Sequence, residues 1–253
     1  MNSPTSQNSL VKNINLNSIR FVSQVSREGC VSSSSSRGYE IVRVKPEHYE
    51  QVMDFLRHNF FLDEPLNVCV QLVGDSRPGT CPELEEFSMG ALQQGLSLMA
   101  VSPDGAVLGC VLNAVSQHED IEELQRLADE CPNPKFKLIL GLLAHIEKEA
   151  DVHHRFDVER VFEIPMLSVD SNCRGRGIAT ALLRDAVELA TSLNVPLVRV
   201  DCSSKFTAMA VAKLGLEPVY NLKYNTYLPP GAEQPPFNPA YPHDEVASYV
   251  KRL

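Results

Sequence analysis

Two arginines and two glycines are concentrated in one turn of the sequence VDSNCRGRGIATALL, which spans residues 169–183. The turn, Arg174-Gly175-Arg176-Gly177, separates an apolar segment from a helical pattern. Glycine lets a backbone approach a ligand closely, and the free N–H groups of a first helical turn donate to anions. The arginines add positive charge beside them. The stretch therefore predicts a site for a phosphate-bearing ligand.

Three glycine-rich patterns bind phosphates in this way. A P-loop requires Lys and then Ser or Thr after its last glycine, and Ile178-Ala179 exclude it. A dinucleotide fingerprint requires glycine where Thr180 stands, although Asp201 could serve as its ribose-binding acid, so it remains the lesser alternative. The acyl-CoA turn, Arg/Gln-x-x-Gly-x-Gly/Ala, is matched by Arg174, Gly177 and Ala179. This last pattern is favoured.

Acidic and nucleophilic residues elsewhere in the chain suggest acid–base chemistry. Glu64 stands between Phe60-Phe61-Leu62 and Pro65-Leu66, where apolar neighbours could desolvate its carboxylate and raise its pKa toward neutrality. By composition alone, Asp63 and Glu64 are more often solvated loop acids. Cys202 is a candidate acyl acceptor, but no positioned histidine accompanies it, which disfavours a covalent route.

The histidines do not indicate a metal centre. His145 and Glu149 are four residues apart on a helical pattern, but no third ligand is evident. His153-His154 are interpreted as a polar loop. We therefore predict no metal.

Alternating and helical patterns predict the elements that position these residues. A strand over 39–44 leads into a helix that begins near Pro46, and a second helix is predicted over 82–94. A β-hairpin is predicted around Ser102-Pro103-Asp104-Gly105. Further predictions are helices over 119–129 and 135–151, a buried strand over 161–169, a helix from Ile178 to Leu193, a strand over 196–202, a helix from Ala208 to Leu214, a long strand over 216–228 and an edge strand over 245–250.

The segment from the strand over 161–169 through the glycine turn to the strand over 196–202 forms a βαβ unit, so those two strands should be parallel. Residues 1–37, rich in Ser and Asn, are predicted to be a disordered tail rather than a transit peptide, leaving 38–253 as a single domain.

Composition limits the partners. The net charge of −9 argues against nucleic-acid binding, because affinity for phosphate backbones depends on Lys and Arg. No apolar run approaches the roughly 20 residues that span a bilayer. The seven cysteines are scattered, which is typical of free thiols in a reducing compartment. We expect a cytoplasmic protein, monomeric, that binds neither membrane nor nucleic acid.

The order of predicted elements, together with four further motifs, resembles the GNAT superfamily of acetyl-CoA-dependent N-acetyltransferases. More specifically, the chain looks like the insect arylalkylamine N-acetyltransferases, which act on dopamine or serotonin. The resemblance covers residues 39–250, and its motifs beside CRGRGIA are FFLDEPLN, NPKFKLIL, LSVDSNCRG and DCSSKFTAMAVAKLG. It implies an α/β GNAT fold, with a central mixed twisted sheet of about seven strands flanked by helices and a splayed parallel strand pair at the acetyl-CoA site.

The resemblance also implies roles for individual residues. Glu64 is expected to be the catalytic base, and Ser203 and Thr207 to relay protons. Thr207 stands where the family has serine, and its methyl group restricts the rotamers of that hydroxyl. Ser203 alternatively suits the N-cap of the following helix. Acetyl-CoA is expected at Leu167, Ser168, Val169, Arg174, Gly175, Arg176, Gly177, Ile178, Ala179 and Thr180.

The expected acceptor is a small primary amine, and Asp63 and Phe61 are candidates to contact it. Phe87, Tyr220 and Tyr224 are further aromatic candidates. An arylalkylamine is the preferred substrate class. Agmatine or polyamines are the alternative acceptors, and a non-catalytic acyl-CoA-binding role is the alternative function.

Overall fold

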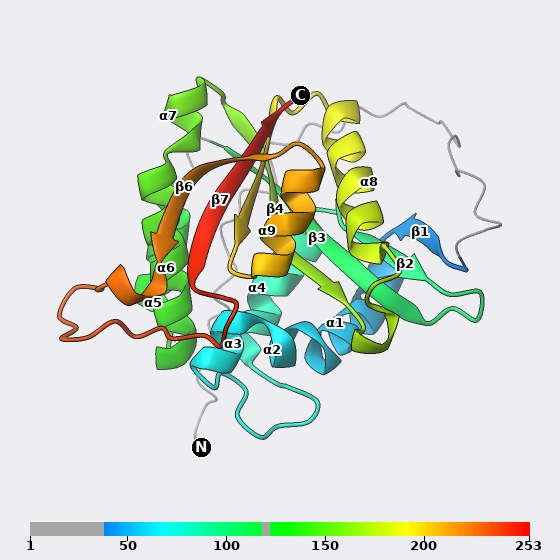
Figure 1. Ribbon diagram of the computed structural model, residues 1–253. Helices are drawn as coiled ribbons and strands as arrows, with labels where there is room; N and C mark the ends of the chain where they lie inside the picture. The colour runs from blue at the N-terminus through cyan, green and yellow to red at the C-terminus, as the bar shows by residue number, and fades with distance from the viewer. Residues whose placement is uncertain (1–37, 118–121) are drawn as a thin grey trace, which may run out of the picture.

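A computed structural model describes residues 38–117 and 122–253, and they form one seven-stranded mixed sheet (Figure 1). The strand order is β1-β2-β3-β4-β5-β7-β6. The strands are β1 (Glu40–Arg43), β2 (Leu98–Val101), β3 (Val107–Gln117), β4 (Arg160–Val169), β5 (Leu197–Cys202), β6 (Glu217–Lys223) and β7 (Glu245–Arg252).

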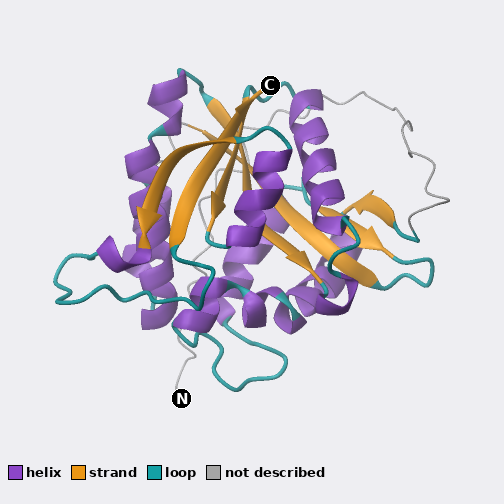
Figure 2. Ribbon diagram, in the orientation of Figure 1, coloured by secondary structure: helices purple, strands orange, loops and turns teal. Residues whose placement is uncertain are grey.

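Helices cover both faces of this sheet (Figure 2). They are α1 (Tyr49–His58), α2 (Phe60–Asp63), α3 (Pro65–Cys69), α4 (Pro82–Gln93), α5 (Glu123–Glu130), α6 (Pro134–Ala150), α7 (Val152–Phe156), α8 (Ile178–Ser192) and α9 (Lys205–Lys213). Within the described residues, no helix is long and apolar enough to cross a membrane.

Alternation along the strands separates two apolar cores. Met99 packs with residues of α1, α4 and α6, whereas its neighbours Leu98 and Ala100 pack with residues of α8 and α9. Because successive side chains of a strand point to opposite faces, one short apolar run contributes to both cores. The predicted α/β fold is confirmed, and so is the hairpin that joins β2 to β3.

The parallel pair β4 and β5 separates partway along its length. Its register joins Phe162 to Val198 and Glu163 to Arg199. Pro165 follows on β4, and since proline lacks an N–H, it cannot donate to a ladder at that point. The remainder of β4 and the end of β5 instead form walls of one cavity. The predicted splayed pair therefore opens just beyond Glu163 and Arg199.

The last strand, β7, corrects one prediction. It lies between β5 and β6 and pairs antiparallel with both, so β6 is the edge strand. The apolar residues Val246, Ala247 and Val250 are buried, as an internal strand requires. The predicted long strand over 216–228 ends earlier, at Lys223, where a 3₁₀ turn over Tyr224–Thr226 begins.

The histidines and several helix boundaries also differ from the predictions. His153 is buried on α7, and its Nδ1 lies 3.0 Å from the carbonyl oxygen of Val158, so it does not lie in a polar loop. The helix predicted to begin near Pro46 starts at Tyr49, after a 3₁₀ turn over Pro46–His48, and ends at His58; α2 and α3 follow as short separate helices. The predicted tail 1–37 and the start of the helix predicted over 119–129 lie outside the described residues.

Candidate functional site

The glycine turn has the backbone conformation that its sequence requires. Gly175 and Gly177 have φ angles of 76° and 78°, in the left-handed region that glycine adopts without a steric penalty. Gly177 is the N-cap of α8, so the N–H groups of Ile178, Ala179 and Thr180 lie in the first turn. Those amides have no partner within the helix, because its first hydrogen bond runs from Ala181 N to Gly177 O.

A cavity of about 840 Å³ adjoins this turn. It passes between the separated strands, from the start of α8 on one face of the sheet to Phe87 and Phe136 on the other. Of the residues expected to hold acetyl-CoA, all but Arg176 line it: Leu167, Ser168, Val169, Arg174, Gly175, Gly177, Ile178, Ala179 and Thr180.

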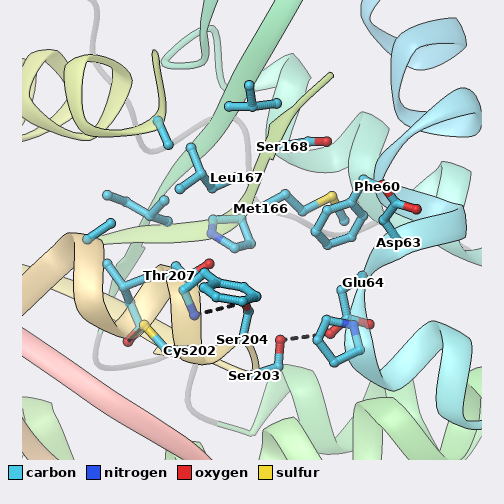
Figure 3. A pocket seen from close by; sticks show the side chains of 18 of the residues that line it. Phe60, Asp63, Glu64, Met166, Leu167, Ser168, Cys202, Ser203, Ser204 and Thr207 are labelled. Carbon is cyan, nitrogen blue, oxygen red and sulfur yellow. Dashed lines mark hydrogen bonds between the residues drawn. The ribbon is translucent and has the colours of Figure 1, made fainter. Parts of the chain in front are cut away.

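Glu64 and Ser203, 139 residues apart in sequence, form a hydrogen bond in this cavity (Figure 3). Ser203 Oγ donates to Glu64 Oε1 at 2.7 Å, and the backbone N–H of Asn67 donates to Glu64 Oε2 at 2.7 Å. Burial raises the pKa of the Glu64 carboxyl, while hydrogen bonds from Ser203 and from the N–H groups of Asn67 and Leu66 partly oppose that rise. A carboxylate with a raised pKa in a cavity can accept a proton from a bound cation.

The local sequence fixes Glu64 in place. It is the N-cap of α3, with Pro65 in the first helical position, and its side chain caps the N–H of Asn67. Proline at the first position and an oxygen-bearing side chain at the cap are both characteristic of a helix start. The adjacent residues Glu64-Pro65 were thus a signal in the sequence that a helix begins here and that the Glu64 carboxylate is hydrogen-bonded to its backbone.

The position of Ser203 is supported by Tyr224, which the sequence suggested only as a candidate to contact the acceptor. Tyr224 Oη donates to the Ser203 carbonyl oxygen at 3.1 Å, and burial raises the pKa of the Tyr224 phenol, which keeps it a donor. Ser204, not Ser203, caps α9, because its side chain accepts from Phe206 N. The Ser203 hydroxyl is therefore available to Glu64.

Other predicted residues are placed as follows. Thr207 lines the cavity from α9, as Figure 3 shows. Phe61 is fully buried in the core on the α1, α4 and α6 face, and its neighbour Phe60 lines the cavity instead. Arg176 is exposed, and its Nη1 lies 3.8 Å from Cys173 Sγ. Burial raises the pKa of the Cys202 thiol, which disfavours the thiolate that a nucleophile requires.

Of the remaining residues predicted to contact the acceptor, some line the cavity and some do not. Phe87 lines the cavity, whereas Tyr220 does not. Asp63 lines the cavity but is paired with Arg174, whose Nη2 donates to Asp63 Oδ2 at 2.6 Å. Among the described residues no group of three or more His, Cys, Asp or Glu side chains could hold a metal ion, and the absence of a metal stays a prediction.

Comparison with known proteins identifies the family of this chain. The profile of the Acetyltransferase (GNAT) family matches residues 69–216, more than half of the chain. The chain belongs to the GNAT acetyltransferase family. Members of this family use acetyl-CoA and a small-molecule acceptor.

Solved GNAT structures are similar over most of the chain. Arylalkylamine N-acetyltransferase 2 from Aedes aegypti is 33% identical, with a TM-score of 0.79, and the match covers 85% of this chain and 98% of that one. A polyamine N-acetyltransferase from Drosophila melanogaster that forms N-acetylagmatine is 27% identical, with a TM-score of 0.76 over 85% and 100% of the two chains. An agmatine N-acetyltransferase gives the same identity, TM-score and coverage.

The cavity has the volume and the backbone donors that a phosphate-bearing ligand requires. Its volume is in the range of ligand sites, and unpaired N–H groups at the start of α8 suit a pyrophosphate. A Cβ at Gly175 or at Gly177 would have no heavy atom within 4 Å, so the space beside the turn is open. Lys213 of α9 adds a further cation to the cavity wall.

Proposed function

We propose that this GNAT protein transfers the acetyl group of acetyl-CoA to the primary amine of an arylalkylamine, by direct attack in a ternary complex. The observation that carries the proposal is the hydrogen-bonded pair Glu64–Ser203, which lies in the same cavity as the glycine turn. The turn proposed to hold the CoA phosphates and the proposed proton acceptor thus line one cavity. The similarity to an arylalkylamine N-acetyltransferase at 33% identity supports the substrate class.

Glu64 is proposed as the general base. An arylalkylamine arrives as an ammonium whose pKa is about 10, so one proton must leave before the nitrogen can attack. Burial disfavours the charged carboxylate of Glu64, and uptake of that proton relieves the penalty. The amine nitrogen then forms a bond to the thioester carbon as the C–S bond breaks.

A second proton leaves the nitrogen after this attack, and one proton must reach the departing thiolate. Thr207 and Ser203 carry hydroxyls in the cavity wall and are proposed to relay these protons. Ser203 already donates to Glu64, so a proton can pass along that bond. Cys202 is not proposed as an acyl acceptor, because its thiol is buried.

The two ends of the cavity are proposed to hold different ligands. Acetyl-CoA would lie along β4 and the start of α8, with its phosphates on the amides of the turn and on Arg174. The acceptor would lie on the side of Phe60, Phe87 and Phe136, where aromatic rings can pack on an aryl group. Asp63 would attract the cationic amine.

A second candidate acceptor class is agmatine or a polyamine. Two similar structures, each 27% identical, are an agmatine and a polyamine N-acetyltransferase. The acidic net charge of −9 suits either class of cation.

The test is a direct assay of the purified protein. Release of the CoA thiol is followed with acetyl-CoA and a panel of dopamine, serotonin, tyramine, octopamine, agmatine and spermidine. The proposal expects turnover that is fastest with the arylalkylamines. Preference for agmatine or spermidine would replace the acceptor class, and no thiol release with any amine, while acetyl-CoA still stabilises the protein, would support a binding-only role.

A further inference from the structure

A buried ionic cluster lies where β4 and β5 separate. Arg199 on β5 is only 2% exposed in its side chain and faces three carboxylates. Its Nη2 lies 2.7 Å from Asp201 Oδ2, and its Nη1 lies 3.5 Å from Glu147 Oε1 and 3.8 Å from Glu163 Oε1. One guanidinium thus faces three acids, so with all of them ionised the cluster carries excess negative charge.

Glu163 has room for another partner. Ser116 Oγ donates to Glu163 Oε1 at 3.0 Å, and Arg199 is more distant from Glu163 than from the other two acids. A carboxylate has about four lone-pair positions, so acceptor capacity remains. The Glu163 side chain keeps 19% of its surface exposed, whereas Arg199 is enclosed.

That exposed surface faces a second cavity, of about 340 Å³, on the α4 and α6 side of the sheet. Glu163, Glu147, Arg199 and Asp201 all line it. The second cavity adjoins the larger one. Six residues form walls of both: Phe87, Phe136, Leu143, Ile164, Pro165 and Asp201.

The wall shared by the two cavities is mostly apolar. Phe87 and Phe136 pack edge to face with ring centroids 6.2 Å apart, and Leu143, Ile164 and Pro165 complete an apolar lining. A ligand that extends from Glu64 toward Glu163 would meet the apolar and aromatic groups of the shared wall, with Asp201 beside them, before it reached the Glu163 carboxylate. An apolar wall followed by a carboxylate suits a molecule with an apolar middle and a polar far end.

We propose that the second cavity receives the far end of the acceptor, and that the Glu163 carboxylate accepts a hydrogen bond from a donor group carried there. The donor is a ring hydroxyl in an arylalkylamine or a guanidinium in an aminoalkylguanidine. This inference rests on the proposed function, and it assigns Glu163 to substrate specificity. The reacting amine remains at Glu64, at the other end of the same molecule.

Two matched pairs of amines test the proposal with the full-length protein and acetyl-CoA, at a pH above 8, where the Glu163 carboxyl is ionised. Tyramine and phenethylamine differ by one ring hydroxyl, and agmatine and pentylamine differ in the guanidinium. Because a hydrogen bond to a charged group contributes enough for about a tenfold preference, kcat/KM should favour the donor-bearing member of at least one pair by about that factor. The favoured pair identifies the donor.

Two variants then locate the effect. Glu163→Gln keeps the shape but removes the charge, and the preference should fall severalfold. Ala114→Leu adds volume beside Glu163, with which Ala114 is in register across β3 and β4, and turnover of long amines should fall relative to propylamine. Glu149→Gln, an exposed acid of α6 outside both cavities, is the matched control and should keep the wild-type preference.

The outcomes separate this inference from the proposed function. Each variant is also checked for thermal stabilisation by CoA, and the result is taken from a variant that retains it. No preference in the wild type, or a wild-type preference unchanged in both folded variants, overturns the inference and leaves the acetyltransferase proposal intact. If no amine is acetylated, the proposed function fails, and stabilisation by tyramine or agmatine that is lost in Glu163→Gln would still support the cavity.

Discussion

Arg174 and Asp63 form an ion pair that joins the glycine turn to the segment carrying Glu64. Arg174 Nη2 donates to Asp63 Oδ2 at 2.6 Å, and Arg174 Nε also donates to the carbonyl oxygen of Val169 at 3.3 Å. Asp63 immediately precedes Glu64 in the sequence. A phosphate bound at the turn would compete with Asp63 for the same guanidinium, so the pair connects the two ends of the cavity.

The competition at Arg174 predicts opposite effects of two substitutions on CoA binding. Both partners are about half exposed, so the pair contributes about 0.2 to 1 kcal/mol. Asp63→Asn releases Arg174 and should tighten CoA by up to about fivefold, whereas Arg174→Gln should weaken it by about tenfold. Calorimetric titration with CoA at low and moderate salt measures both. Arg176→Gln, outside the cavity, should have a smaller effect, and weaker binding in Asp63→Asn would contradict the competition.

The Glu64–Ser203 hydrogen bond predicts a shift in the pH profile. A general base acts when ionised, so kcat/KM should rise with pH through the pKa of Glu64, which burial has raised. Ser203 donates to the carboxylate and lowers that pKa, so Ser203→Ala should move the rising limb to higher pH. Glu64→Gln should lower kcat/KM by about 10² to 10⁴ and abolish the limb. A limb that stays in place in Ser203→Ala would show that another group controls it.

Gly177 offers a matched test of backbone conformation. Gly177 and Gly105 have φ angles of 78° and 85°, and a Cβ at either would have no heavy atom within 4 Å. Alanine at either position therefore suffers only the left-handed strain, about 1 to 2 kcal/mol. Urea denaturation should show similar losses of stability for Gly177→Ala and Gly105→Ala, but only Gly177→Ala should weaken CoA binding. Equal CoA affinities would exclude a role for the turn.

Glu163 predicts a pH dependence of stability. The pKa of Glu163 is raised to about 8, because burial and the neighbouring acids Glu147 and Asp201 together outweigh the opposing effect of Arg199. An ordinary carboxyl in the unfolded chain has a pKa of about 4.3, so between these values the folded state binds more protons and the free energy of unfolding falls as pH rises. Urea denaturation at pH 5 and pH 8 should show that fall. In Glu163→Gln the fall in the free energy of unfolding should be smaller. An unchanged fall would show that another group titrates between these pH values.

Several features of this protein were determined by the sequence itself because they depend on neighbouring residues. Glycines at 175 and 177 specify a turn that other residues enter only under strain, and Gly177 indeed caps α8. The βαβ pattern around them predicts a parallel pair, since a crossover helix returns the chain in the same direction. These signals are local, and the structure contains the turn, the helix and the parallel pair.

Tertiary structure decided the features that depend on distant segments. The C-terminal strand was predicted at the edge, yet β7 inserts between β5 and β6, because strand order depends on which segments bury one another's faces. Phe61 was predicted to contact the acceptor, but Phe60 lines the cavity instead and Phe61 is buried in the core. The reason is again tertiary, since adjacent residues of a short helix point in different directions.

The chemistry of the site shows the same division. A local pattern indicates that Glu64 begins a helix, but its raised pKa comes from the packing that surrounds it and its partner Ser203 lies 139 residues away. Nothing near Glu163 in sequence predicts its contact with Arg199 or a second cavity beside it. The sequence by itself therefore determined the turn that suits a phosphate, whereas only the folded chain placed the buried Glu64 carboxyl in the same cavity, because burial and contact between distant residues arise only when the strands and helices pack.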